Sequence, residues 1–132
     1  MRIILDLGEL HEVARVTMND RRSQSLWKPP YTVDVTQEAA SGTLKLEIDV
    51  ANLWVNRLIG DERTCADDCE WNENGGIKKI PEWVKMGEKS PTGRITFTTW
   101  KHWKKTDRLL PSGLIGPVRL ITEKTDSERN SK

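Results

Sequence analysis

Two short stretches of the sequence concentrate side chains that could bind a sugar. One follows the longest alternating segment of the chain, and the other lies among lysines near residue 100. Indole rings offer a large flat surface for the apolar face of a pyranose, while amide, guanidinium and imidazole groups can hydrogen-bond to hydroxyls. The sequence therefore predicts a sugar-binding surface made of Trp54, Asn56, Arg57, Trp100, His102 and Trp103.

The second stretch has two alternative interpretations. Tryptophans interleaved with Lys101, Lys104 and Lys105 could also stack nucleobases. However, 21 Lys and Arg against 20 Asp and Glu give a formal net charge of only +1, which provides little attraction for a polyanion. Packing of Trp100 or Trp103 over the end of a hydrophobic core is an equally strong alternative. We therefore predict no nucleic-acid partner and leave core packing open.

A cluster of acidic residues could in principle bind a cation or catalyse hydrolysis. Carboxylates are ligands for calcium, but this cluster lacks the glycine-punctuated order of a calcium loop, which favours a solvated acidic loop. Two carboxylates also suffice for glycoside hydrolysis, and Glu62, Asp67 or Glu70 could act in this way. Nothing in the sequence indicates the desolvation that would raise the pKa of one of them. We predict no catalytic residue, metal or cofactor among Asp61, Glu62, Asp67, Asp68 and Glu70.

The remaining reactive side chains form no recognisable catalytic set. Cys65 and Cys69 are separated by three residues, so a disulfide would need a tight turn, and a metal site would need two further ligands. Free thiols are the favoured interpretation. His11 and His102 have no serine or cysteine in a nucleophile elbow, and the sequence has no glycine-rich phosphate loop.

The length of the chain indicates one domain. A chain of 132 residues can bury roughly two thirds of its unfolded surface. The mean hydropathy is −0.64, no apolar run reaches the length of a membrane span, and Asp6 interrupts the N-terminal apolar residues before a signal-like segment develops. We therefore expect no membrane partner and no export signal in this chain.

Alternating hydrophobicity predicts a series of β-strands. In the longest, Thr43–Val50, every second residue is apolar, which is typical of a strand with one buried face. We predict that it is a central strand that runs into a loop, and that Asn19 and Asp20 form a hairpin turn. Glu9–Glu12 is expected to be a connection. The other predicted strands are 2–7, 13–18, 24–27, 31–36, 94–100 and 118–122.

The segment between the predicted strands at 43–50 and 94–100 has no regular period of hydrophobic residues. Residues 58–93 show no strand alternation and no amphipathic helix of normal length, with one helical turn expected at Pro81–Lys85. Short strands separated by turn signals predict an all-β sandwich or jelly roll. We expect this sandwich to cover residues 1–122 and to be followed by a disordered polar tail, 123–132.

Several segments resemble a family of sugar-binding domains. LDLGELHEVARVTMND, LWKPPYTVDVT and GTLKLEIDVANLWVNRLIGDE resemble the galactose-binding-like β-sandwich domain attached to glycoside hydrolases, as in family 2 enzymes. CEWN, TGRITFTTWKHW and LLPSGLIGPV make the resemblance closer to the C-terminal part of family 106 α-L-rhamnosidase-like proteins. The resemblance covers Leu5 to about Leu120. It implies a jelly-roll fold and an accessory, non-catalytic module of a carbohydrate-active protein.

Two features depart from the resembled family. In the family, further strands precede the position of Leu5, and a catalytic domain lies far upstream. The first hairpin of the family usually has Asn-Gly where this chain has Asn19-Asp20. A sandwich without its first strands would expose a sheet edge. We therefore expect a fragment of a larger hydrolase that packs on a catalytic domain or associates with itself. The alternative is a purely structural module in which every tryptophan is buried.

Overall fold

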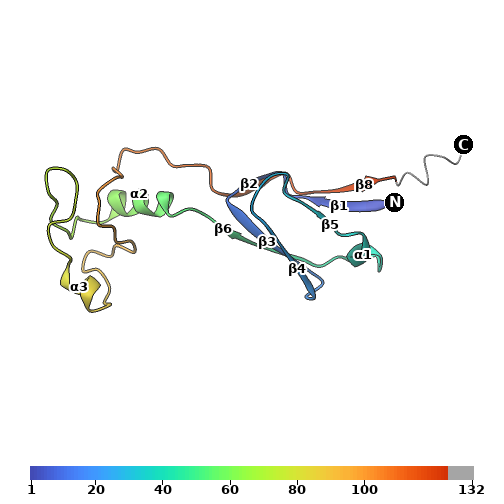
Figure 1. Ribbon diagram of the computed structural model, residues 1–132, viewed down its shortest axis with the longest axis horizontal. Helices are drawn as coiled ribbons and strands as arrows, with labels where there is room; N and C mark the ends of the chain where they lie inside the picture. Colours follow the sequence, from blue (N-terminus) through green and yellow to red (C-terminus); the bar gives the residue numbers. More distant parts are fainter. Residues whose placement is uncertain (125–132) are drawn as a thin grey trace, which may run out of the picture. The chain divides into compact units, whose positions relative to one another are not determined.

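The computed structural model describes residues 1–124, which fall into two compact units (Figure 1). The first, here called the β unit, comprises Met1–Leu53 and Pro111–Lys132, and the second, the loop unit, comprises Trp54–Leu110. All the strands of the described part of the chain belong to the β unit. The sequence instead led us to expect one sandwich across residues 1–122. The expected tail lies outside the described residues from position 125 onward.

The β unit consists of antiparallel sheets, which confirms the predicted all-β class. One sheet has the strand order β5-β1-β8, and a second has the order β4-β3-β6. A short pair joins β2 to β7. The strands are β1 (Arg2–Asp6), β2 (Glu9–His11), β3 (Val13–Met18), β4 (Arg22–Leu26), β5 (Thr32–Asp34), β6 (Leu46–Ala51), β7 (Gly113–Gly116) and β8 (Arg119–Glu123). The β unit also contains one short helix, α1 (Thr36–Ala39).

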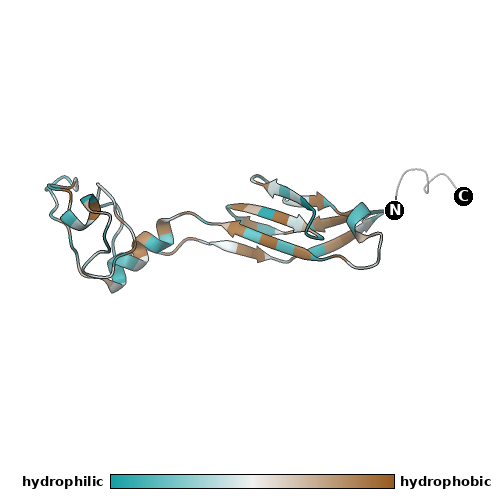
Figure 2. Cartoon of the chain, turned by 90° about the horizontal axis from the view of Figure 1, so that it is seen from below, coloured by the Kyte–Doolittle hydropathy of each residue, from teal (hydrophilic) through white to brown (hydrophobic). Residues whose placement is uncertain are grey.

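A single hydrophobic core joins the two larger sheets. Along β3 every second side chain, starting at Ala14, is fully buried, while the residues between them face outward. Figure 2 shows the same alternation of apolar and polar residues along the strands. Burying each large apolar side chain contributes about 1.5–3 kcal/mol. The core consists of Leu5, Leu7, Leu10, Ala14, Val16, Met18, Leu26, Val33 and Val35.

The predicted hairpin turn between β3 and β4 is confirmed. Asn19 and Asp20 both have left-handed backbone angles, with φ of 50° and 56°. The Asn19 side chain accepts a hydrogen bond from the Lys45 backbone amide at 2.8 Å and donates one to the Glu38 carbonyl at 2.9 Å. The Lys45 ammonium reaches Asp20 at 2.8 Å. These contacts stabilise a turn that would otherwise strain two non-glycine residues.

Two features of the β unit differ from the sequence prediction. Among residues 1–124, β6 pairs with β3 alone and lies at a sheet edge, so the prediction that it is a central strand was wrong. The predicted connection at Glu9–Glu12 contains β2, which pairs with β7 through a register shift between Glu9 and Leu10. Strands this short carry too few residues to show a two-residue period, so their pairing depends on tertiary contacts.

The loop unit contains two helices, α2 (Val55–Thr64) and α3 (Glu82–Lys85). The expected helical turn is confirmed by α3, which Pro81 immediately precedes. The expected loop after β6 was wrong, because α2 begins at Val55. Its inward residues follow the i, i+3, i+4, i+7 spacing of a helix face, but the apolar stripe is only Val55, Leu58 and Ile59, too short to be recognised. None of the helices in the described part is long and apolar enough to cross a membrane.

Candidate functional site

One buried carboxylate organises the loop unit. Asp61, on the inner face of α2, is only 1% exposed. Its Oδ2 accepts hydrogen bonds from the backbone amides of Ile95 (3.0 Å) and Thr96 (2.8 Å) and from the Thr96 hydroxyl (2.8 Å). The predicted strand at 94–100 was therefore wrong: the backbone amides of Ile95 and Thr96 donate to a carboxylate from α2 and not to a neighbouring strand.

The same contacts set the ionisation of Asp61. Burial acts to raise its pKa, but the hydrogen bonds from Thr96 and Ile95 and the charge of Arg57, 3.7 Å away, outweigh burial and hold the pKa below the usual value. The carboxylate therefore stays charged at neutral pH. Its role in the structure is to bind segment 94–100 to α2.

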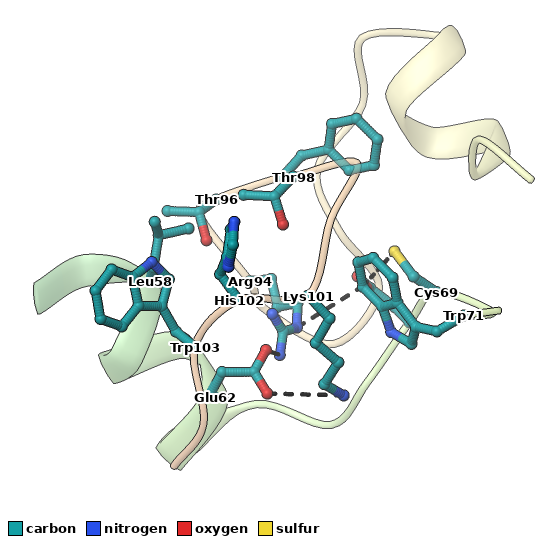
Figure 3. Close-up of a pocket in the computed structure, with 12 residues that line it drawn as sticks. Leu58, Glu62, Cys69, Trp71, Arg94, Thr96, Thr98, Lys101, His102 and Trp103 are labelled. Carbon is teal, nitrogen blue, oxygen red and sulfur yellow. Dashed lines mark hydrogen bonds and ion pairs between the residues drawn. The ribbon is translucent and has the colours of Figure 1, made fainter. Parts of the chain in front are cut away.

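A second set of charged groups forms a network that includes Glu62, Arg94 and Lys101 (Figure 3). The Glu62 carboxylate lies 2.5 Å from the Arg94 guanidinium and 3.8 Å from the Lys101 ammonium. Arg94 also lies 3.8 Å from Asp68, which is almost fully buried. Since these acidic residues are paired and largely removed from water, the prediction of a solvated acidic loop was wrong for Asp61, Glu62 and Asp68.

Asp67 belongs to the same network. Its partial burial acts to raise its pKa, but hydrogen bonds from Lys101 and from the Trp71 indole hold the pKa below the usual value. A general acid in glycoside hydrolysis needs the opposite shift, a raised pKa. Glu62 and Asp67, two of the three carboxylates considered for catalysis, are thus arranged as ion-pair partners.

Asp67, Asp68 and Cys69 could offer ligand atoms to a metal, since these atoms lie within 4.8 Å of one another. Two observations oppose this use. Lys101 already neutralises Asp67, and burial, together with the neighbouring Asp68, raises the pKa of the Cys69 thiol to about 11, which disfavours the thiolate that binds metals. Cys65 and Cys69 are both free thiols, as predicted.

An aromatic groove of about 420 Å³ lies on the loop unit. Trp100 contributes a half-exposed ring that lies 6.2 Å, centroid to centroid, from the His102 imidazole. Gly75 and Gly76 lie under the Trp100 ring, where a Cβ on either would be 3.5 Å from it, and the Lys101 amide donates to the Gly75 carbonyl at 2.8 Å. The groove is lined by Leu58, Phe97, Thr98, Thr99, Trp100, His102 and Trp103.

The structure brings together three of the six predicted sugar-contact residues. Trp100, His102 and Trp103 line the groove, and Figure 3 shows Trp103 beside Leu58 of α2. The other three are outside its lining: Trp54 is exposed at the start of α2, Asn56 exchanges hydrogen bonds with the Leu110 backbone at 2.8 and 2.9 Å, and Arg57 pairs with Asp61.

Sequence reasoning missed four residues that line the groove, namely Thr98 and Thr99, which carry hydroxyls, and the two apolar residues Leu58 and Phe97. Leu58 was assigned to a loop, and only the helical spacing of Val55, Leu58 and Ile59 could have indicated that it faces inward. Phe97 was assigned to a strand, whereas it packs edge-on against Trp83 with ring centroids 6.0 Å apart. Both residues supply apolar surface rather than hydrogen-bonding groups.

Comparison with known proteins relates the chain to glycoside hydrolases. A Formosa agariphila protein named "Putative beta-glucuronidase" is 45% identical over 120 residues, which is 90% of this chain and 10% of that protein. A solved structure of a rhamnosidase from Novosphingobium sp. PP1Y matches with a TM-score of 0.64 and 34% identity, over 90% of this chain and 9% of that one. No protein-family model matches. The chain thus spans about a tenth of either relative.

Proposed function

We propose that this chain is an accessory module of a glycoside hydrolase, non-catalytic by itself, which contacts carbohydrate through the aromatic groove. Both relatives carry the names of glycosidases, and the chain corresponds to a small part of each. The galactose-binding-like assignment and a place beside a catalytic domain belong to the same proposal. The charged network supports the non-catalytic role, because its carboxylates are paired with Arg94 and Lys101.

The observation that carries the proposal is the shared position of Trp100, His102 and Trp103 along one groove. Trp100 is 45% exposed, although its ring is held from below by the Gly75–Gly76 backbone. A ring that is fixed in place and open on one face can stack on a pyranose at little entropic cost. The adjacent imidazole and the threonine hydroxyls can hydrogen-bond to sugar hydroxyls.

Calorimetry of the full chain with saccharides tests this contact. The names of the relatives suggest two probes, an oligosaccharide that contains rhamnose and one that contains glucuronic acid. We expect one of them to bind and Trp100→Ala or Trp103→Ala to weaken binding at least about tenfold, which corresponds to about 1.4 kcal/mol. Trp27→Ala is the matched control, because Trp27 is exposed but belongs to the β unit. Absence of heat with both probes, or equal losses in all three variants, contradicts the contact.

The second candidate is a purely structural module that packs on a catalytic domain. Its strict form, with every tryptophan buried, is wrong, because Trp27, Trp54 and Trp100 are 68%, 62% and 45% exposed. Exposed tryptophans also suit a protein interface. Fluorescence quenching by acrylamide separates the two functions: saccharide should protect Trp100 from the quencher if the groove binds sugar, and should change nothing if the module is only structural.

A further inference from the structure

The edge strand β8 is exposed along its whole length. It pairs with β1 on one side only and forms the end of its sheet among the described residues. All five of its residues are exposed, including Leu120 and Ile121. A strand with one unpaired edge and exposed apolar side chains is a template for adding another strand.

The sequence of β8 is complementary to itself. In RLITE, Arg119 and Glu123 lie at equal distances on either side of Ile121. An antiparallel copy centred on Ile121 would place Arg119 opposite Glu123 at both ends, Leu120 opposite Thr122, and Ile121 opposite itself. Opposite charges and apolar pairs directly across an antiparallel ladder are stabilising. This two-fold arrangement is the usual symmetry of a homodimer.

The longest of the other edge strands in the described part of the β unit, β6, lacks this complementarity. β6 also pairs on one side only, but its exposed face carries Glu47 and Asp49. An antiparallel copy centred on Ile48 would place these two carboxylates opposite each other twice. Like charges across a ladder are destabilising, and charges of this kind protect natural sheet edges from association. Self-pairing is therefore disfavoured at β6 and favoured at β8.

We propose that two copies of this chain pair through β8 and form a two-fold dimer with a continuous six-stranded sheet in the order β5-β1-β8-β8-β1-β5. Ile121 lies on the symmetry axis, and the Arg119 and Glu123 pairs fix the register. The dimer surface belongs to the β unit, whereas the aromatic groove belongs to the loop unit. Loss of dimer formation is therefore distinguishable from loss of saccharide binding.

Sedimentation equilibrium over a range of protein concentrations tests the dimer. We expect the 15.1 kDa chain to reach twice that mass, and Ile121→Lys to shift the equilibrium to monomer because it opposes two ammonium groups at the axis. Ile80→Lys is the matched control, since Ile80 is 43% exposed and Ile121 40%, and it should leave the dimer intact. A wild-type chain that is monomeric at every concentration, or a dimer that survives Ile121→Lys, overturns the proposal.

A cysteine at the axis tests the register. Residues directly opposite in an antiparallel pair have Cα atoms about 4.5–5.5 Å apart, a separation that a disulfide can bridge. In a background of Cys65→Ser and Cys69→Ser, Ile121→Cys should form a disulfide-linked dimer on mild oxidation, and Ile80→Cys should not. Circular dichroism confirms that each variant is folded. A folded Ile121→Cys chain that stays unlinked, or cross-links no faster than Ile80→Cys, overturns the register.

Discussion

Leu5 and Leu120 lie directly opposite each other in the antiparallel pair of β1 and β8, yet Leu5 is 0% exposed and Leu120 is 56% exposed. Opposite residues of an antiparallel pair point to the same face of the sheet. The inner face of this sheet is therefore covered over β1 and open over β8. The hydrophobic core ends between two neighbouring strands.

This difference predicts unequal costs for the same substitution. Leu5→Ala should lower the free energy of unfolding by about 2–5 kcal/mol, because it leaves a cavity in a closed core. Leu120→Ala removes little buried surface and should cost no more than about 1 kcal/mol. Urea unfolding followed by far-ultraviolet circular dichroism measures both costs, at a low protein concentration at which the proposed dimer would dissociate. Equal costs would contradict the open face.

Replacing the buried carboxylate should weaken the loop unit. Asp61→Asn removes the negative charge that Arg57 faces and leaves a neutral amide oxygen, with two lone pairs, for the three hydrogen bonds now made to Oδ2 by Ile95 and Thr96. We expect a loss of about 1–3 kcal/mol, the usual cost of leaving buried polar groups unsatisfied. Five of the six tryptophans lie in this unit, so tryptophan fluorescence reports its unfolding. Glu70→Gln, an exposed change in the same unit, is the control and should be neutral.

Acid should weaken one contact of the β unit in a defined pH range. Hydrogen bonds from the Thr36 hydroxyl and amide, together with the Arg2 guanidinium, lower the pKa of Asp34 from 3.8 to about 2. Because the folded-state pKa lies below the unfolded value, the stabilisation is fully present above pH 3.8 and is lost as the pH falls towards 2. Unfolding midpoints measured across this range should fall less steeply for Asp34→Asn than for wild type. Equal slopes of the unfolding midpoint against pH in the two proteins would contradict the assignment of this acid sensitivity to Asp34.

Gly8 should tolerate no side chain. It has φ of +65°, and an added Cβ would lie 2.6 Å from the carbonyl carbon of Gly116. Gly42 has φ of +82° but nothing within 4 Å of the same position. Gly42→Ala should therefore cost only the left-handed backbone penalty of about 1–2 kcal/mol, and Gly8→Ala clearly more. Thermal unfolding compares the two variants, and an equal or smaller cost at Gly8 would show that the β1–β2 connection can move away from Gly116.

The sequence by itself determined the parts of the fold that depend on neighbouring residues. The alternation of Val13–Met18 gave the bounds of β3 and its buried face, and Asn19-Asp20 gave the hairpin, because the two-residue period and turn preferences are local properties. Of the candidate site, the residue types that are close in sequence, Trp100, His102 and Trp103, were found together for the same reason.

Only the tertiary structure decided the rest. Segment 94–100 alternates like a strand, but the Asp61 carboxylate 34 residues away binds its backbone amides, and no local pattern encodes that contact. The groove gains Leu58 because α2 packs against this segment, while Arg57, still half exposed, pairs with Asp61. Hydrogen bonds and packing contacts between distant residues outweigh local propensity. The free-energy cost of leaving a buried polar group unsatisfied exceeds the free-energy difference between strand and loop conformations of one residue.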